Sequence, residues 1–547
     1  MDAMQRLIET DAVKRLKERD PLLFSDEVDM RQKIVQRLGW TDLAQTAPGR
    51  LPLVTNLAKA LVEEGARDVV LLGMGGSSLA ALTMSRVLGS APGMPRLHVL
   101  DTTSPAVVRT IMDSCDRAST FFLLSSKSGT TVEPLSLNEI FRAWMEEEME
   151  RPAAGKHFIA ITDPGSPLEK LRQREVMRVA LSAPATVGGR FSALSMFGLA
   201  PSALIGIDLE TLISHAQAME KACHRRPKEN PGAQLAAFLV DAYEQGADKV
   251  TLVCSERYRS FGVWVEQLVA ESTGKNAVGL VPVIEYDVSL PTGFGSDRAV
   301  IVMREHDDSE LAGYATQVAA QNALVEFALQ SHLEIGAEFV RWEYATALAG
   351  HLLGINPFDE PNVAQAKETT ARVLAGDAEV PRAIADVGGS WVTYAGGLTG
   401  GRAPDDIASA ARRALEAAGV GDYFAWLAYL PDEDSLLEPL REAASTVSRS
   451  TGRAVCLETG PRYLHSTGQL HKGGPNTGVF TVITARDRAD IAIPGQTYTL
   501  AQLFRAQAEG DLVTLAAHDR RVMRLDLPDS KPATVAALAD ALVSAST

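Results

Sequence analysis

Hydrophobic residues along this chain fall into two kinds of pattern. Short continuous apolar runs, such as VVLLG from Val69, TFFLL from Thr120 and FIAIT from Phe158, alternate with longer stretches whose apolar positions recur at helical spacing. Continuous apolar runs indicate strands buried on both faces, and their alternation with helices indicates parallel sheets that are covered by helices. The pattern therefore predicts an α/β fold.

This alternation also divides the chain into segments. Residues 1–49 are rich in both charges and helical in period, and a first series of strands and helices follows over 50–230. A second series, with KVTLVC and RAVIVMRE as strands, covers 231–385, and a third, with SWVTYAG and GVFTVITA, covers 386–547. We expect an N-terminal helical segment, two related α/β domains that face each other, and a third C-terminal α/β unit.

Two predicted strands end in turns with unusual chemistry. One turn is GMGGSSLA at 73–80 and the other is SSKSGTT at 125–131, which is followed by an amphipathic helix. The first turn of a helix has unpaired N–H groups and the positive end of the helix dipole, so it favours anions. We predict that the two turns converge on a phosphate, with Gly76, Ser77, Ser126, Lys127, Ser128 and Thr131 as its ligands. A helix cap, which needs only one hydroxyl, is the simpler alternative.

The glycine turn also raises the possibility of a dinucleotide site. Its spacing does not give GxGxxG, because Ser78 stands where the third glycine would be. The acidic residue after the second strand, Asp101, lies well beyond the usual distance of ~20 residues. Phosphate binding is therefore the better interpretation of this turn.

Charge and composition exclude several classes of function. The chain has 547 residues and a formal net charge of −16, so it lacks the basic surface that nucleic acid requires. No apolar run is long enough to span a membrane. The four cysteines lie far apart and the N-terminus does not read as a signal peptide, so we expect a cytoplasmic protein with free thiols.

Two further stretches carry candidate functional residues. Arg190 interrupts the apolar passage VGGRFSALSMFG, where it is either a ligand contact or part of a helix-cap salt bridge. In the third unit, YLHSTGQLHKGGPNTG places His465 and His471 six residues apart among glycines. No Cys, Asp or Glu stands beside them at ligand spacing, so we expect no metal. These histidines either contact a polar sugar or phosphate or are solvated loop residues.

Taken together, these motifs resemble the phosphoglucose isomerase family. GMGGSS, SSKSGTT, VGGRFSALSMFG, AESTGK and NPFDEPNVAQAK occur in the family's order over roughly residues 50–380. The resemblance implies two sugar isomerase domains, a small phosphosugar substrate, no cofactor, and a homodimer that interconverts glucose 6-phosphate and fructose 6-phosphate. The third unit is similar to the tail of bacterial fusions of transaldolase with this isomerase, so we expect the isomerase portion standing alone.

The resemblance also assigns roles to single residues. It makes Glu271 of AESTGK the base that moves a proton between C1 and C2, Arg190 the group that stabilises the enediolate, and Lys367 the lysine that assists ring opening. Glu271 follows the apolar stretch VWVEQLVA, and apolar surroundings raise the pKa of a carboxyl group to suit such a base.

One family residue has no counterpart at the usual place. The family has a histidine between AESTGK and NPFD that is usually lent by the other subunit, but here that place reads LPTGFGSDRAVIV. Three histidines lie between these motifs: His306 has the neighbours of a solvated loop, His351 those of a core helix, and His332 is possible but unsupported by its neighbours. We therefore expect His471 of GQLH, in the third unit, to open the sugar ring.

Two alternatives remain open from the sequence. The enzyme could act on both glucose and mannose 6-phosphates, because the motifs do not decide how tightly C2 is held. The chain could instead be a non-catalytic phosphosugar-binding regulatory module. Such a module keeps the serine-rich turn but has no need of Glu271, Arg190 and Lys367 together.

Overall fold

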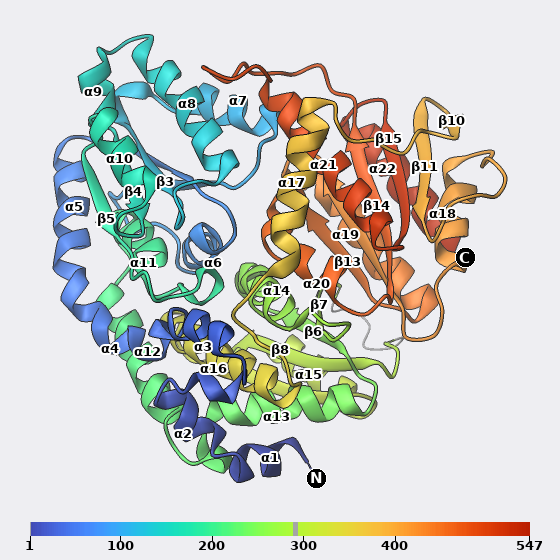
Figure 1. The fold of residues 1–547 in the computed structure, drawn as a ribbon, viewed down its shortest axis with the longest axis horizontal. Helices are drawn as coiled ribbons and strands as arrows, with labels where there is room; N and C mark the ends of the chain where they lie inside the picture. The colour runs from blue at the N-terminus through green and yellow to red at the C-terminus, as the bar shows by residue number, and fades with distance from the viewer. Residues whose placement is uncertain (1, 288–293) are drawn as a thin grey trace.

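The computed structural model describes residues 2–287 and 294–547, which form three β-sheets with helices packed on them (Figure 1). The predicted α/β fold, with parallel sheets flanked by helices and a further sheet in the C-terminal region, is confirmed. The residues LPTG at 290–293, which begin the stretch where a family histidine was sought, lie outside the described residues.

The first sheet is entirely parallel, with the strand order β2-β1-β3-β4-β5. Its strands are β1 (Asp68–Leu72), β2 (Arg96–Leu100), β3 (Thr120–Ser125), β4 (Phe158–Thr162) and β5 (Val179–Ser182). The helices around it are α5 (Leu51–Glu63), α6 (Leu79–Leu88), α7 (Pro105–Ser114), α8 (Val132–Glu146), α9 (Arg151–Gly155), α10 (Pro167–Arg174) and α11 (Met196–Leu204). The strand order reverses between β1 and β3, which opens a crevice at their carboxyl ends.

The second sheet repeats this plan with the parallel order β7-β6-β8-β9. Its strands are β6 (Lys249–Cys254), β7 (Val281–Glu285), β8 (Arg298–Glu305) and β9 (Ala323–Leu329). The accompanying helices are α13 (Pro231–Glu244), α14 (Arg259–Thr273), α15 (Ser309–Val318) and α16 (Ile335–Leu352), and α12 (Leu209–Ala222), which precedes residue 230 in the chain, packs on α16. Helix α14 packs against α6 of the first unit, so the carboxyl-terminal end of α14 comes close to the crevice of the first sheet.

The N-terminal segment packs mainly on the second unit. Helix α1 (Ala3–Glu9) contacts α13 and α16, and α2 (Ala12–Lys17) contacts α16. Helix α4 (Leu43–Thr46) contacts α12, and α3 (Val28–Val35) lies beside them. Trp40 stacks on Phe191 and meets Tyr344 edge-on, which ties the segment to both units.

The third sheet is mixed, with the order β10-β11-β15-β14-β12-β13. Strands β12 (Tyr423–Tyr429), β13 (Val455–Thr459), β14 (Gly478–Ala485) and β15 (Arg521–Leu527) are parallel, and β10 (Ala385–Val387) and β11 (Ser390–Gly396) are antiparallel at one edge. Its helices are α18 (Ile407–Glu416), α19 (Asp434–Thr451), α20 (Gly468–Gly473), α21 (Leu500–Ala517) and α22 (Pro532–Ser546).

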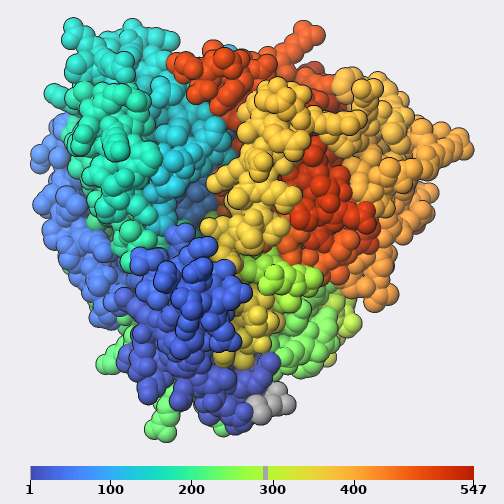
Figure 2. All heavy atoms as spheres, viewed as in Figure 1, coloured from blue at the N-terminus to red at the C-terminus, as the bar shows by residue number. Residues whose placement is uncertain are grey.

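Helix α17 (Pro361–Ala375) follows the second unit and runs along the junction with the third. It packs on α20 and α21, and Figure 2 shows its yellow surface between the blue-to-teal first unit and the red C-terminal unit. Among the described residues, no helix combines the length and hydropathy that a membrane crossing needs.

Candidate active site

A cavity of about 430 Å³ lies at the carboxyl ends of β1 and β3, and all three units contribute to its wall. Eight of the ten residues predicted from the sequence line it: Gly76, Ser77, Lys127, Ser128, Thr131, Arg190, Glu271 and Lys367. Ser126 lies just behind the wall, with its hydroxyl 3.1 Å from that of Thr131. His471 is elsewhere, as described below.

The two predicted turns do converge at this cavity. The Ser125 hydroxyl donates to the backbone oxygen of Ser77 at 2.8 Å, which joins the turn after β3 to the turn after β1. Thr131 occupies the N-cap position of α8, but its side chain makes no capping hydrogen bond. A helix cap therefore does not explain this hydroxyl, which lines the cavity instead.

Two glycines in these turns allow close contacts with neighbouring segments of the chain. Gly129 has a left-handed backbone (φ 69°), and a Cβ there would lie 2.7 Å from the backbone nitrogen of Leu168. A Cβ on Gly76 would lie 2.1 Å from the backbone oxygen of Gly189. Both distances are shorter than a carbon atom tolerates, so these positions need glycine.

Lys127 is held at one side of the cavity. Its ammonium group pairs with the Asp163 carboxylate and donates to the backbone oxygen of Ala185 at 3.3 Å. Burial lowers the pKa of Lys127, although the neighbouring carboxylate counteracts this effect.

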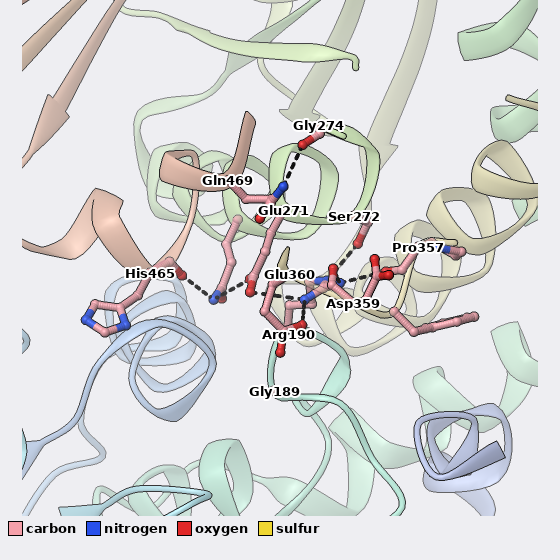
Figure 3. Close-up of polar contacts among 12 residues, drawn as sticks. Gly189, Arg190, Glu271, Ser272, Gly274, Pro357, Asp359, Glu360, His465 and Gln469 are labelled. Atoms are coloured by element: carbon pink, nitrogen blue, oxygen red, sulfur yellow. Dashed lines mark hydrogen bonds and ion pairs between the residues drawn. The ribbon is translucent and has the colours of Figure 1, made fainter. Parts of the chain in front are cut away.

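Glu271 and Arg190 form an ion pair at the other side. Glu271 lies on the buried face of α14, and Arg190 lies in the short helix η6 (Gly189–Phe191), with 3.0 Å between Oε1 and Nη1 (Figure 3). Burial raises the pKa of the Glu271 carboxyl group, and the charge of Arg190 limits the rise. A buried carboxylate with a raised pKa is suited to accept a proton near neutral pH.

Every nitrogen of the Arg190 guanidinium has a partner. Its Nε donates to the Ser272 hydroxyl at 2.9 Å, and its Nη2 donates to the backbone oxygens of Pro357 and Asp359 at 2.8 and 2.9 Å. Its Nη1 also lies 3.1 Å from the Glu360 carboxylate. These contacts fix the plane of the guanidinium beside Glu271, and they come from the NPFD segment, from Glu360 and from α14.

Lys367 lies on α17 and faces the same cavity. Within the described part of the chain, its ammonium group has no hydrogen-bond or ion-pair partner, so it is available to a ligand. It lies near enough to Glu133 for its charge to help lower the pKa of that carboxyl group.

The histidine that reaches the cavity is His465, not His471. Its Nε2 lies 2.8 Å from Oε1 of Glu133, and the amide of Gln507 donates to the same oxygen at 2.8 Å. Burial alone would raise the pKa of the Glu133 carboxyl, but the charge of His465 and its hydrogen bond bring that pKa below its ordinary value.

The expected position of His471 was wrong for a structural reason. Residues 468–473 form the short helix α20 and not an open glycine loop, and His471 is on its buried face. Its Nε2 lies 3.3 Å from Glu458, and its ring packs 5.0 Å from that of Phe480. The sequence offered no signal to separate it from His465, since both stand in the same glycine-rich stretch.

Several cavity residues were not singled out from the sequence, although Glu360 stands within NPFDEPNVAQAK. Gln267 stands one helical turn before Glu271 on α14 and donates to its Oε2 at 3.2 Å. Arg37 of the N-terminal segment and Glu360 also line the cavity. For Gln267 the sequence did hold one clue: it stands 4 residues before Glu271 on a predicted helix, and residues at that spacing lie on the same helix face.

A group of possible metal ligands lies outside this cavity. The ligand atoms of Asp68, His98 and Cys115 lie within 4.8 Å of one another. Arg96 already forms an ion pair with Asp68 at 2.8 Å, so the negative charge of that carboxylate is compensated without a metal.

Comparison with known proteins gives this geometry a context. The phosphoglucose isomerase family model matches residues 58–293. A probable glucose-6-phosphate isomerase from Methanococcus maripaludis is 30% identical over 349 residues, which cover 56% of this chain and 79% of the relative. The glucose-6-phosphate isomerase of Rubrobacter xylanophilus is 29% identical over 387 residues, covering 60% of this chain and 89% of the relative.

A solved structure is similar over a longer stretch. The hypothetical protein TT0462 from Thermus thermophilus aligns with a TM-score of 0.60 and 25% identity, and the alignment covers 68% of this chain and 97% of that one. With the sequence motifs gathered around one cavity and a relative matched over most of its length, the chain belongs to the phosphoglucose isomerase family.

Proposed function

We propose that this chain is a glucose-6-phosphate isomerase, which interconverts glucose 6-phosphate and fructose 6-phosphate through a cis-enediol intermediate. The observation that carries the proposal is the buried pair of Glu271 and Arg190, at 3.0 Å, in the same cavity as the serine-rich phosphate turn. The family membership and the names of the relatives point to the same reaction.

Glu271 is the proposed base. It takes the proton from C2 of the open-chain aldose while the C1 carbonyl oxygen gains negative charge. The C1 oxygen then gains a proton as the C2 hydroxyl loses one, and Glu271 returns its proton to C1 to give the ketose. General acid–base catalysis of this kind contributes about 10² to 10⁴ in rate. Arg190 stabilises the developing oxyanion and cannot compete for the proton, because a guanidinium does not deprotonate.

The turns after β1 and β3 together supply the proposed phosphate site. Ser77, Ser126, Ser128, Thr131 and Lys127 offer hydroxyl and ammonium donors around the uncapped start of α8. Binding energy from the 6-phosphate, which does not react, holds C1 and C2 beside the carboxylate.

His465 and Lys367 are the proposed ring-opening groups. Opening the cyclic sugar requires one proton to reach the ring oxygen and another to leave the C1 hydroxyl. Both side chains line the cavity, and they come from different elements, η10 (Arg462–His465) and α17. His465 thus takes the role expected of His471.

The buried ion pair favours an isomerase over a regulatory binding module. A module that only binds a phosphosugar gains nothing from a desolvated carboxylate, which is costly to bury. A bifunctional enzyme that also accepts mannose 6-phosphate remains the second candidate, because isomerisation of either aldose begins with removal of the proton on C2.

A coupled assay with fructose 6-phosphate and then with mannose 6-phosphate tests the function. We expect turnover of fructose 6-phosphate, and a Glu271→Gln variant whose kcat is lower by at least about 10²-fold while phosphosugar binding persists. A matched control is Glu310→Gln, which changes a carboxylate on the exposed face of α15 and should leave kcat unchanged. Wild-type protein that binds fructose 6-phosphate without turning it over would support the regulatory module instead.

Three further features belong to this proposal. We propose the division of the chain at residues 49, 230 and 385, a cytoplasmic location, and a homodimer. Limited proteolysis tests the division, and light scattering on a size-exclusion column tests the assembly. The likeness of the C-terminal unit to the tail of transaldolase fusions also stays a proposal.

A further inference from the structure

The C-terminal unit reaches the cavity through His465, and its backbone is tied to the proposed base. The backbone oxygen of His465 accepts a hydrogen bond from Nε2 of Gln267 at 2.7 Å, and the same nitrogen lies 3.2 Å from Oε2 of Glu271. One amide group of the second unit therefore bridges the C-terminal unit and the catalytic carboxylate.

The His465 side chain ends a buried hydrogen-bond chain that crosses between units. The hydroxyl of Thr103 donates to Oε1 of Gln507 at 2.6 Å, and Nε2 of Gln507 donates to Glu133 at 2.8 Å. Glu133 in turn lies 2.8 Å from Nε2 of His465. Thr103 and Glu133 belong to the first unit and Gln507 to the C-terminal unit, so neither unit can build this chain alone.

Glycines in the first two units leave the space that the C-terminal unit fills. Gly75, in the turn after β1, has φ 54°, and a Cβ there would lie 2.8 Å from the backbone oxygen of His465. A Cβ on Gly274, just after α14, would lie 2.3 Å from Cα of Leu470. The backbone of the C-terminal unit thus touches the two motifs that hold the phosphate turn and the base.

Buried polar contacts hold the C-terminal unit in this position. Arg462 forms two hydrogen bonds with Asp101 of the first unit, at 2.7 and 2.8 Å, and another with Asp432 at 2.6 Å. Gln469 donates to the backbone oxygen of Gly274 at 2.9 Å and accepts from the backbone nitrogen of Asn362 at 2.9 Å. Buried charges require such pairing, so the contacts are part of the folded site.

We propose that the C-terminal unit completes the active site of its own chain, with Gln507 as the positioning residue for the Glu133–His465 pair. A single chain is then the catalytic unit, whether or not chains associate. The inference rests on the proposed isomerase function, because it concerns how that site is assembled.

Complementation between two inactive variants distinguishes an active site that one chain builds alone from an active site that two chains share. Glu271→Gln and His465→Ala chains are produced together with different affinity tags, and assemblies that carry both tags are isolated and assayed. We expect no more activity than the two variants show separately, because each chain lacks one group of its own site. Where no mixed assembly forms, an equimolar mixture of the two variants is assayed, and we again expect no restored activity. The specific activity of the wild-type protein is then measured over a dilution series and should not vary with protein concentration.

Restored activity would overturn the proposal. In a symmetric dimer with shared sites, one of the two sites in a mixed pair has no substitution, so about half of the wild-type activity would return. Wild-type protein assayed alongside keeps this outcome distinct from a failure of the isomerase function, which would leave the wild type inactive. His306→Ala, which removes an exposed histidine, is the control for histidine removal and should keep the specific activity of the wild type.

The role of Gln507 is tested by its effect on sugar-ring opening. Exchange between the α and β anomers of glucose 6-phosphate, followed by NMR, reports ring opening without isomerisation. We expect Gln507→Leu to reduce both enzyme-catalysed anomer exchange and kcat about 10-fold or more. KM should stay within about 2-fold of wild type, because a misplaced catalytic group slows the reaction more than it weakens substrate binding. If Gln507→Leu does not fold, Thr103→Val, which removes the donor to Gln507, carries the same prediction.

The control variant is Gln502→Leu, on the exposed face of α21, whose side chain caps the helix and does not reach the cavity. It should lower thermal stability and leave anomer exchange unchanged. A folded Gln507→Leu or Thr103→Val variant with wild-type anomer exchange would overturn the positioning role.

Discussion

The Glu271 carboxylate combines two environments that oppose each other. Burial in α14 disfavours its charged form and raises its pKa, whereas Arg190 at 3.0 Å favours the charged form. Burial has the larger effect, so Glu271 holds its proton to a higher pH than an exposed glutamate does, and as a carboxylate it is a stronger base. The arginine keeps the carboxylate form accessible near neutral pH.

This balance predicts the acidic limb of the pH profile. Activity requires the carboxylate form of Glu271, so kcat/KM should fall as pH decreases through a pKa above the ordinary value of 4.5. In Arg190→Gln the compensating cation is gone, so the pKa should rise further and the acidic limb should move to higher pH. Profiles of kcat/KM for both proteins measure this, and a limb that stays in place or moves to lower pH would contradict the proposed pairing.

Most of the proposed catalytic residues could be predicted from the sequence, but the histidine could not. The motifs that contain Glu271, Arg190 and Lys367 are short continuous stretches of sequence, so they could be recognised without knowledge of the fold. His465 could not be separated from His471, because the choice depends on a short helix over 468–473 that its own glycines disfavour. Packing against α14 and α17 decides that helix, and packing is not visible in a local pattern.

At the scale of elements, the site follows from strand order. β1 and β3 are neighbours although β2 separates them in the chain, and this reversal brings the GMGG and SSKSGTT turns together. Continuous apolar runs identified these strands in the sequence because both faces of a parallel sheet are buried. The contribution of α14 was less visible, because it comes from the second unit and reaches the crevice only through packing on α6.

Helix α12 offers a test of packing against the N-terminal segment. Burial raises the pKa of Glu220 to about 7, and its carboxylate accepts from the backbone nitrogen of Ala44 at 3.2 Å. Between the ordinary value of 4.5 and about 7, the folded state holds a proton that the unfolded state has released. The free energy of unfolding should therefore fall as pH rises through this window, because the native state binds more protons.

Glu220→Gln removes this titration while keeping an acceptor for Ala44. We expect the variant to be more stable than wild type at pH 8 by about 1 to 3 kcal/mol, with a smaller difference at pH 5. Urea unfolding at the two pH values provides the measurement. An equal difference at both pH values would show that the carboxyl of Glu220 is not what titrates.

At the scale of the whole molecule, three sheets surround one cavity, and the third is held there by long-range ion pairs. Arg462 and Asp101 are 361 positions apart in the chain, and their contact joins the C-terminal unit to the carboxyl end of β2. The sequence predicted three α/β units from local patterns. It could not predict how the third unit closes the site, since a contact over such a separation leaves no local signature.

Removing the arginine of this contact should loosen the assembly. Arg462→Leu leaves Asp101 buried with an unpaired charge, which costs about 3 to 5 kcal/mol. We expect a lower unfolding temperature by calorimetry and reduced activity, because His465 follows three residues later on the same short helix η10. The double variant Arg462→Leu with Asp101→Asn should be more stable than Arg462→Leu alone, and a double variant that is less stable would argue against this pairing.

The most direct test of the account is the transfer of the proton between C1 and C2. In D₂O, wild-type protein supplied with fructose 6-phosphate should place deuterium at C2 of the glucose 6-phosphate formed, since the protonated base exchanges with solvent. Glu271→Gln should bind the sugar and still exchange its anomers, but NMR should detect no deuterium at C2. Deuterium at C2 at a rate close to that of wild type, in a folded Glu271→Gln protein, would contradict the central claim.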